Sequence, residues 1–293
     1  MKNIALLLAL VGIIATRTTG SAADGDILKR ISDTKTVTIG HRDKAVPLSF
    51  VDSDGQAKGY SIDICVKIAE AAAKQLKIDK LNIKFLPITQ QTRIPLLTAG
   101  TVDIICESST HTFGRSEQVS FLNTTFLTGT KLLVRKDSGI RSIADLNGKV
   151  LVSILGSTNE RVARAEVDRL GIKLNGDMRK VKEHTQAMLE LEQGRADALA
   201  SDDVVLYGDR SVAKDPSQWE VVGPYLSYDP YGMMIPRNND DWRLIGNREI
   251  ARLIQSGEMT AIYKKWFEPG PTNINYPLSE RLKANFDLIA FPE

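Results

Sequence analysis

Three arginines follow or adjoin stretches that the sequence predicts to be buried strands. Arg42, Arg93 and Arg115 are accompanied there by serine, threonine and aspartate side chains. A guanidinium is planar and donates two parallel hydrogen bonds, which is the geometry that a carboxylate accepts. A single arginine in such a position is more often a surface residue. Three of them, placed among hydroxyl and acidic side chains, predict a site for a small ligand that carries carboxylates.

The other polar side chains near these strands can complete such a site. Hydroxyls and the amide groups at a helix N-terminus donate hydrogen bonds to a carboxylate, which suits Ser108, Thr110 and the turn at 156–158. An α-ammonium group only donates and needs an anionic acceptor. Asp202 provides one, and the adjacent Asp203 is an equally acidic alternative. We therefore expect an amino acid with two carboxylates, because the site holds more arginines than one carboxylate needs.

The elements that must position these residues alternate between β-rich runs and amphipathic helical stretches, which is typical of α/β folds. The sequence predicts strands at 36–39, 48–51, 81–86, 102–105, 130–134, 150–154, 196–201 and 233–235. It predicts helices at 61–77, 93–99, 143–146, 160–170 and 186–193, and three more helices after the last strand. The pattern indicates two α/β lobes of about equal size. Ligands of such folds bind beyond the carboxyl ends of strands, often between domains.

The N-terminal segment has the composition of a signal peptide. Lys2 supplies a positive start, and Ile4–Ile14 is an almost unbroken apolar run that is too short to span a bilayer. Small residues follow, so we expect residues 1–23 to be a signal peptide that is cleaved near Ala22 or Ala23. A buried or membrane helix is the alternative. The prediction is that the protein is exported.

The charge of the remaining chain gives no sign of a nucleic-acid or membrane partner. The formal net charge of the full sequence is +2, and residues 1–22 contain two basic residues and no acids, so their removal brings the charge to zero. No later stretch is apolar enough to be a transmembrane helix. About 270 residues remain, enough for one large domain or two of average size.

The cysteines and histidines indicate a disulfide rather than a metal site. Cys65 and Cys106 are the two cysteines of the sequence, and in an oxidising compartment we expect them to be bridged. Two buried thiols are the alternative. His41, His111 and His184 lie far apart in sequence with no pair at helical spacing. We therefore predict no metal and no cofactor.

Several short segments carry a more specific signal. The most specific are GHRD at 40–43 and PITQQTRIPLL at 87–97. The others are GYSIDIC, ESST followed by Arg115, LGST, QGRADALASDD and YKKWF. Together, over about residues 31–286, these segments resemble the periplasmic glutamate/aspartate-binding proteins of bacterial ABC transporters.

This resemblance implies a fold and a function. The fold would be α/β with two lobes, each a central sheet flanked by helices, formed by residues 24–128 with 231–293 and by residues 129–230. Two crossing strands near 126–130 and 228–232 would act as the hinge on which the lobes close. The protein would be a periplasmic monomer, not an enzyme, that delivers L-glutamate or L-aspartate to the membrane permease subunits of an ABC importer.

The resemblance also assigns roles to individual residues. Arg42 and Arg93 match the pair that binds the side-chain carboxylate, and Arg115 matches the centre of the clamp on the α-carboxylate. His184 matches a second-lobe residue near the ligand side chain, with a partly exposed loop histidine as the alternative. The full set of candidate ligand-binding residues is Arg42, Gln90, Arg93, Ser108, Ser109, Thr110, Arg115, Thr158, His184 and Asp202.

Gln90 and Glu107 each suggest an alternative to the binding of glutamate. Gln90 stands where close relatives carry a serine, and its longer amide would favour aspartate over glutamate or reach an amide ligand instead. A dehydratase-like enzyme on the same scaffold would need an acid or base without a neutralising cation, for which Glu107 is the available carboxyl. No nucleophile elbow, catalytic carboxylate pair or phosphate loop accompanies it. A soluble sensing partner of a receptor would use the same binding chemistry as a transport protein.

Overall fold

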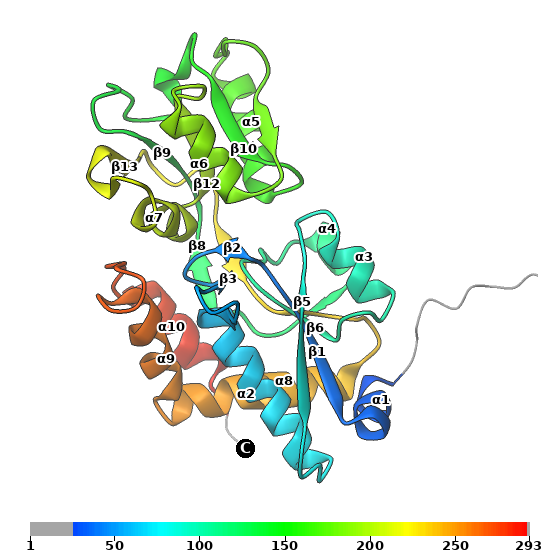
Figure 1. Cartoon of the computed structure of the whole chain (residues 1–293). Helices are drawn as coiled ribbons and strands as arrows, with labels where there is room; N and C mark the ends of the chain where they lie inside the picture. Colours follow the sequence, from blue (N-terminus) through cyan, green and yellow to red (C-terminus); the bar gives the residue numbers. More distant parts are fainter. Residues whose placement is uncertain (1–25, 292–293) are drawn as a thin grey trace, which may run out of the picture.

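A five-stranded sheet forms the centre of the first lobe in the computed structural model, which describes residues 26–291 (Figure 1). The strands lie in the order β5 (Asn82–Pro87), β1 (Thr36–His41), β6 (Ile104–Cys106), β15 (Met234–Ile235) and β7 (Ser120–Phe121). β1 runs parallel to β5 and β6, whereas β15 runs antiparallel to β6 and β7. The predicted signal peptide, residues 1–23 with cleavage near Ala22 or Ala23, lies outside the described residues.

Helices from both ends of the chain pack around this sheet. They are α1 (Ile27–Thr34), α2 (Tyr60–Gln75), α3 (Arg93–Thr98), α4 (Phe113–Ser116), α8 (Asp240–Gln255), α9 (Glu258–Phe267) and α10 (Glu280–Ile289). A small antiparallel sheet of β2 (Lys44–Ala45), β3 (Ser49–Val51) and β4 (Ala57–Lys58) completes lobe 1. The three predicted C-terminal helices are therefore confirmed. No helix between residues 26 and 291 has the length and apolar character that a membrane span requires.

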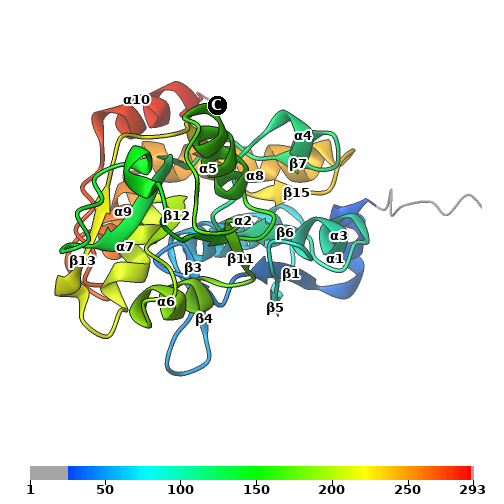
Figure 2. The same cartoon turned by 90° about the horizontal axis from the view of Figure 1, so that it is seen from above.

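The second lobe is built on a sheet of its own. Its strands lie in the order β11 (Arg179–Val181), β10 (Leu151–Ile154), β12 (Ala198–Asp202), β9 (Thr130–Arg135) and β13 (Trp219–Val222). Its helices are α5 (Thr158–Arg169), α6 (His184–Glu192), α7 (Asp203–Ser211) and the short 3-10 helices at Ile143–Leu146 and Pro216–Gln218. α5 and α6 lie on opposite sides of β10 and β12 (Figure 2), and each seals a separate apolar cluster.

Two crossing strands connect the lobes. β8 (Phe126–Thr128) leads from lobe 1 into lobe 2, and β14 (Asp229–Tyr231) leads back. They pair antiparallel, with Asp229 opposite Thr128 and Tyr231 opposite Phe126. This two-stranded connection lies between the lobes in Figure 1, which confirms the predicted two-lobed fold with hinge strands.

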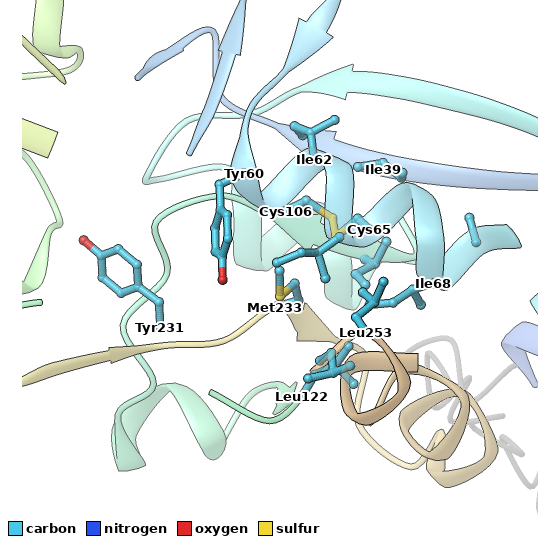
Figure 3. Packing of buried hydrophobic residues seen from close by; sticks show 14 of the residues in the cluster. Ile39, Tyr60, Ile62, Cys65, Ile68, Cys106, Leu122, Tyr231, Met233 and Leu253 are labelled. Carbon is cyan, nitrogen blue, oxygen red and sulfur yellow. A yellow bond between two sulfur atoms is a disulfide. The ribbon is translucent and has the colours of Figure 1, made fainter. Parts of the chain in front are cut away.

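The core of lobe 1 encloses a disulfide. Cys65 on α2 is bonded to Cys106 at the end of β6, with a Cα–Cα distance of 6.3 Å. Both residues are fully buried, and Ile39, Ile68 and Met233 belong to the same apolar cluster (Figure 3). The predicted bridge is therefore confirmed, and the alternative of two free thiols is wrong.

Most predicted elements are present within a few residues of their expected bounds, and two differences have local causes. The helix expected at 61–77 ends at Gln75, and Lys77 beyond it has a left-handed backbone with a φ of 53°. The strand expected at 102–105 is Ile104–Cys106, because the carboxylate of Asp103 takes a hydrogen bond from the backbone of Thr38 at 2.7 Å. The elements that were not predicted are β2, β4, β7, β11, β13, α1, α4, α7 and the 3-10 helix at Pro216–Gln218.

Candidate functional site

A pocket between the lobes collects residues that follow strand ends in both sheets. Lobe 1 contributes the segments after β5 and β6, and lobe 2 contributes the end of β12 and the turn between β10 and α5. The lining residues are Gln90, Ser108, Arg115, Ile154, Ser157, Thr158, Asn159, His184, Ser201, Asp202 and Val205. Six of the ten candidate ligand-binding residues are in this set: Gln90, Ser108, Arg115, Thr158, His184 and Asp202.

Arg115 is a buried cation that has no anionic partner between residues 26 and 291. It lies on α4, which begins where the Thr112 side chain accepts a hydrogen bond from the Arg115 backbone. Its guanidinium donates to the carbonyl oxygen of Thr110 at 2.7 Å, and none of the described carboxylates forms an ion pair with it. Burial, together with the nearby charge of Arg93, lowers the pKa of Arg115 to about 9. The site thus holds a guanidinium that an incoming anion would stabilise.

Asp202 is the matching buried anion. It ends β12 and is 4% exposed, accepting hydrogen bonds from Asn159 at 2.8 Å and from the Tyr231 hydroxyl. Burial and the neighbouring charge of Asp229 raise its pKa to about 8. Among residues 26–291 no cation pairs with it. A cationic ligand group would stabilise its ionised form.

The adjacent Asp203 has a different role. Its carboxylate accepts hydrogen bonds from the hydroxyls of Thr128 and Tyr225 at 2.6 Å and of Tyr276 at 2.9 Å. Thr128 belongs to hinge strand β8, and Tyr276 belongs to the C-terminal part of lobe 1. Asp203 therefore ties lobe 2 to the hinge, and of the two aspartates only Asp202 lines the pocket.

Two further polar residues come from the N-terminal ends of lobe 2 helices. Thr158 is the first residue of α5, and its hydroxyl lies 3.2 Å from that of Thr110 in lobe 1. His184 is the first residue of α6, and its Nδ1 lies 2.7 Å from an oxygen of Asp209. His184 is only 5% exposed and lines the pocket, so the alternative of a partly exposed loop histidine is wrong.

The other two arginines are brought together by a residue to which the sequence assigned no ligand contact. Glu107 follows β6, and its fully buried carboxylate pairs with Arg93 and, at 3.4 Å, with Arg42. Arg42 also pairs with Glu183 of lobe 2 at 2.7 Å, and the Ser109 hydroxyl donates to Glu107 at 2.7 Å. The pocket lining does not include Arg42, Arg93 or Ser109, which are engaged with Glu107 instead.

The environment of Glu107 also bears on the enzyme alternative. Burial raises the pKa of this carboxyl, but the charges of Arg93 and Arg42 outweigh burial and hold it at about 2. A catalytic base would need a carboxylate that no cation neutralises, whereas Glu107 is paired with both Arg42 and Arg93. The sequence signal that could have revealed its role is its position directly after a buried strand, one residue before Ser108.

Three buried polar atoms of the candidate residues lack a hydrogen-bond partner within the described part of the chain. They are the Nε of Arg42, the Nε of Arg93 and the Oε1 of Gln90. Buried polar groups are nearly always paired in folded proteins, so such atoms call for an explanation. No group of three or more described His, Cys, Asp or Glu side chains is arranged to hold a metal ion.

Comparisons with known proteins assign the chain to a protein family. Residues 37–269 match the family of bacterial extracellular solute-binding proteins, family 3. The chain is 38% identical to the L-glutamate/L-aspartate-binding protein of Pseudomonas aeruginosa, over 100% of this chain and 95% of the relative. It is 36% identical to the glutamate/aspartate import solute-binding protein of Escherichia coli, over 96% and 94% of the two chains.

The fold is also similar to that of a solved structure. The substrate-binding protein of an ABC uptake transporter from Streptococcus pneumoniae, solved with bound histidine, superposes with a TM-score of 0.76 at 24% sequence identity. The match covers 86% of this chain and 99% of that one. The similarities extend over both lobes and the strands that join them.

Proposed function

The chain belongs to family 3 of the bacterial extracellular solute-binding proteins, and we propose that it captures glutamate or aspartate in the periplasm and delivers it to an ABC importer. The relatives at 38% and 36% identity are named for binding or import of these two amino acids. The protein acts as a monomer and hands the ligand to membrane permease subunits. It is a binding protein and not an enzyme.

One observation carries this proposal. Arg115 and Asp202 are buried charges of opposite sign that line the same pocket, and neither has an ion-pair partner among the described residues. Leaving either charge alone in a buried site is costly, and a ligand that carries one anion and one cation relieves both costs. The carboxylate and ammonium groups of an α-amino acid are such a pair, so Arg115 binds the first and Asp202 the second.

The other candidate residues complete the contacts. Ser108 and Thr110 lie beside Arg115 and donate to the α-carboxylate. Thr158 and His184 reach the ligand from lobe 2 and stabilise the closed state. The arginine pair, Arg42 and Arg93, binds the ligand side chain through the N–H groups that Glu107 leaves without a partner, with Gln90 and Ser109 nearby.

Calorimetry of the purified protein tests this proposal directly. Glutamate or aspartate should bind 1:1, and Arg115→Ala should weaken binding by at least about a hundredfold, because a charged hydrogen-bond partner is lost from a buried site. Arg243→Ala is the control, since Arg243 is exposed on α8 and, within the described residues, forms an ion pair with Asp240 alone. Failure of both glutamate and aspartate to bind, or binding that does not depend on Arg115, would overturn the proposal.

A further inference from the structure

Glu107 is a buried carboxylate to which the proposed function gives no ligand contact. It bridges the guanidiniums of Arg42 and Arg93, which is the contact that a ligand's side-chain carboxylate would otherwise make. We infer that Glu107 determines the specificity of this site: because it neutralises the arginine pair, glutamine and asparagine bind about as well as glutamate and aspartate. This inference rests on the proposed function, because it concerns the same pocket.

The charges behind the pocket balance without a ligand. Arg42 pairs with Glu107 and Glu183, and Arg93 pairs with Glu107. Two guanidiniums therefore face two carboxylates, and the α-groups of any amino acid balance the two remaining site charges. A ligand with a negative side chain would add an uncompensated charge to a buried site, which is unfavourable. The side chain of glutamine or asparagine adds no charge.

The hydrogen-bonding groups that stay free suit an amide as well as an acid. Arg42 and Arg93 each keep an unpaired Nε–H donor, and Gln90 keeps an unpaired Oε1 acceptor. A primary amide has one acceptor oxygen and two N–H donors, so it can use both kinds of group, whereas a carboxylate only accepts. Rotation of the Gln90 amide would present N–H groups in place of its oxygen. The same residue can therefore complete the contacts of either ligand.

Glu107 is fixed in this arrangement. It is 3% exposed at the end of a core strand, and the Ser109 hydroxyl donates a third hydrogen bond to it at 2.7 Å. Its pKa of about 2 keeps the carboxylate ionised at physiological pH. The bridging carboxylate is thus a permanent part of the site.

Calorimetry with all four amino acids tests the inference. Wild-type protein should bind each amide with an affinity within about tenfold of the matching acid. Glu107→Gln removes one negative charge at constant shape, so it should shift the ratio of acid to amide affinity toward the acid by at least about tenfold. Glu249→Gln is the matched control, because Glu249 is also a buried carboxylate, paired with Arg252 on α8 away from the pocket. This control should leave the ratio unchanged.

The outcomes separate this inference from the proposed function. An acid preference of more than tenfold in wild-type protein would overturn the role of Glu107, and so would a folded Glu107→Gln protein with an unchanged ratio. Such a protein would still bind an acidic amino acid through Arg115, so the proposed function would stand. If Glu107→Gln does not fold, as judged by circular dichroism, the wild-type ratio alone decides.

Discussion

Buried charges without partners are the strongest residue-scale signal in this protein. Arg115 and Asp202 line one pocket, and each is shifted in pKa toward its neutral form, the arginine to about 9 and the aspartic acid to about 8. In both cases burial is the main cause. A structural core would avoid such groups, so their presence at an interlobe pocket indicates a ligand that carries the complementary charges.

The raised pKa of Asp202 predicts that ligand binding releases a proton. Burial and the charges of Asp229 and Asp203 favour its protonated form in the free protein, and Arg115 is the nearby opposing charge. Holding an ammonium group requires the ionised form. Below about pH 8 the affinity should therefore rise with pH, by up to about tenfold per unit, and then level off. Calorimetry at pH 6.5 in buffers of different ionisation enthalpy should show release of about one proton per ligand.

The raised pKa of Asp202 also makes the stability of the folded protein depend on pH. The folded protein holds the Asp202 proton more tightly than the unfolded chain, where the pKa is about 3.8. The contribution of this residue to the free energy of unfolding should therefore fall as pH rises from about 4 to about 8. Asp202→Asn should remove both this dependence and the proton release. Proton release that persists in Asp202→Asn would show that another group titrates on binding.

At this scale the sequence predicted some partners and missed others. Chemistry alone predicted that a guanidinium and a carboxylate near strand ends would bind an amino acid, and the family resemblance singled out Arg115 and Asp202 for these roles. The position of Glu107 directly after a buried strand placed it near the site, but its ion-pair partners could not be assigned, because Arg93 and Arg42 lie 14 and 65 residues away on separate elements. The parallel pairing of β1 with β5 and with β6 brings the three residues to the same sheet edge. The spacing of the sequence also could not show whether Asp202 or Asp203 faces the pocket.

At the scale of elements, the disulfide fixes the strand that carries the most site residues. Cys106 ends β6, and the segment 107–110 that follows it contributes to both the pocket and the arginine pair. The bridge ties this strand end to α2, which lies along the core of lobe 1 (Figure 3). The disulfide therefore stabilises the lobe and also limits the movement of the segment that binds the ligand.

Removal of the bridge should be costly. The two cysteines are 41 residues apart, and a cross-link over a loop of that length lowers the entropy of the unfolded chain enough to contribute about 4 kcal/mol. Cys65→Ser with Cys106→Ser should reduce the free energy of unfolding by roughly that amount in urea denaturation. Treatment of the wild-type protein with a reductant is the parallel measurement. A loss below about 1 kcal/mol would contradict the structural role of the bridge.

The elements that sequence predicted best were long and strongly patterned. Helix α2 and the buried strands β1, β10 and β12 have apolar runs or faces that fix their type. Most of the missed elements, among them β2, β4 and α4, have two to four residues each, which is too short for a periodic pattern. The helices α1 and α7, with eight and nine residues, were also missed. The position of Arg115 nevertheless depends on α4, an element that no hydrophobic pattern in the sequence predicts.

At the scale of the whole molecule, the pocket exists only when the two lobes meet. The contacts that cross from lobe 1 to lobe 2 include Arg42 to Glu183 at 2.7 Å, Thr110 to Thr158 at 3.2 Å and Gln91 to the carbonyl oxygen of Leu155 at 2.7 Å. The antiparallel strands β8 and β14 are the covalent connection between these lobes. Closure about these strands would bring Arg115 of lobe 1 and Asp202 of lobe 2 onto the same ligand.

Gly208 is the point at which closure can be tested without touching the ligand. It lies on α7 of lobe 2, and a Cβ at this position would collide with the carbonyl oxygen of Val46 in lobe 1. Gly208→Ala should therefore favour the open state. The affinity for the ligand falls with the fraction of molecules that can close, so we expect a loss of at least about tenfold in calorimetry. Small-angle X-ray scattering at saturating ligand should show a larger radius of gyration than for wild-type protein.

Gly270→Ala, where a Cβ would meet neighbouring atoms no closer than 3.7 Å, is the control and should close normally. Full closure and unchanged affinity in Gly208→Ala would show that the lobes meet in a different geometry in the bound state.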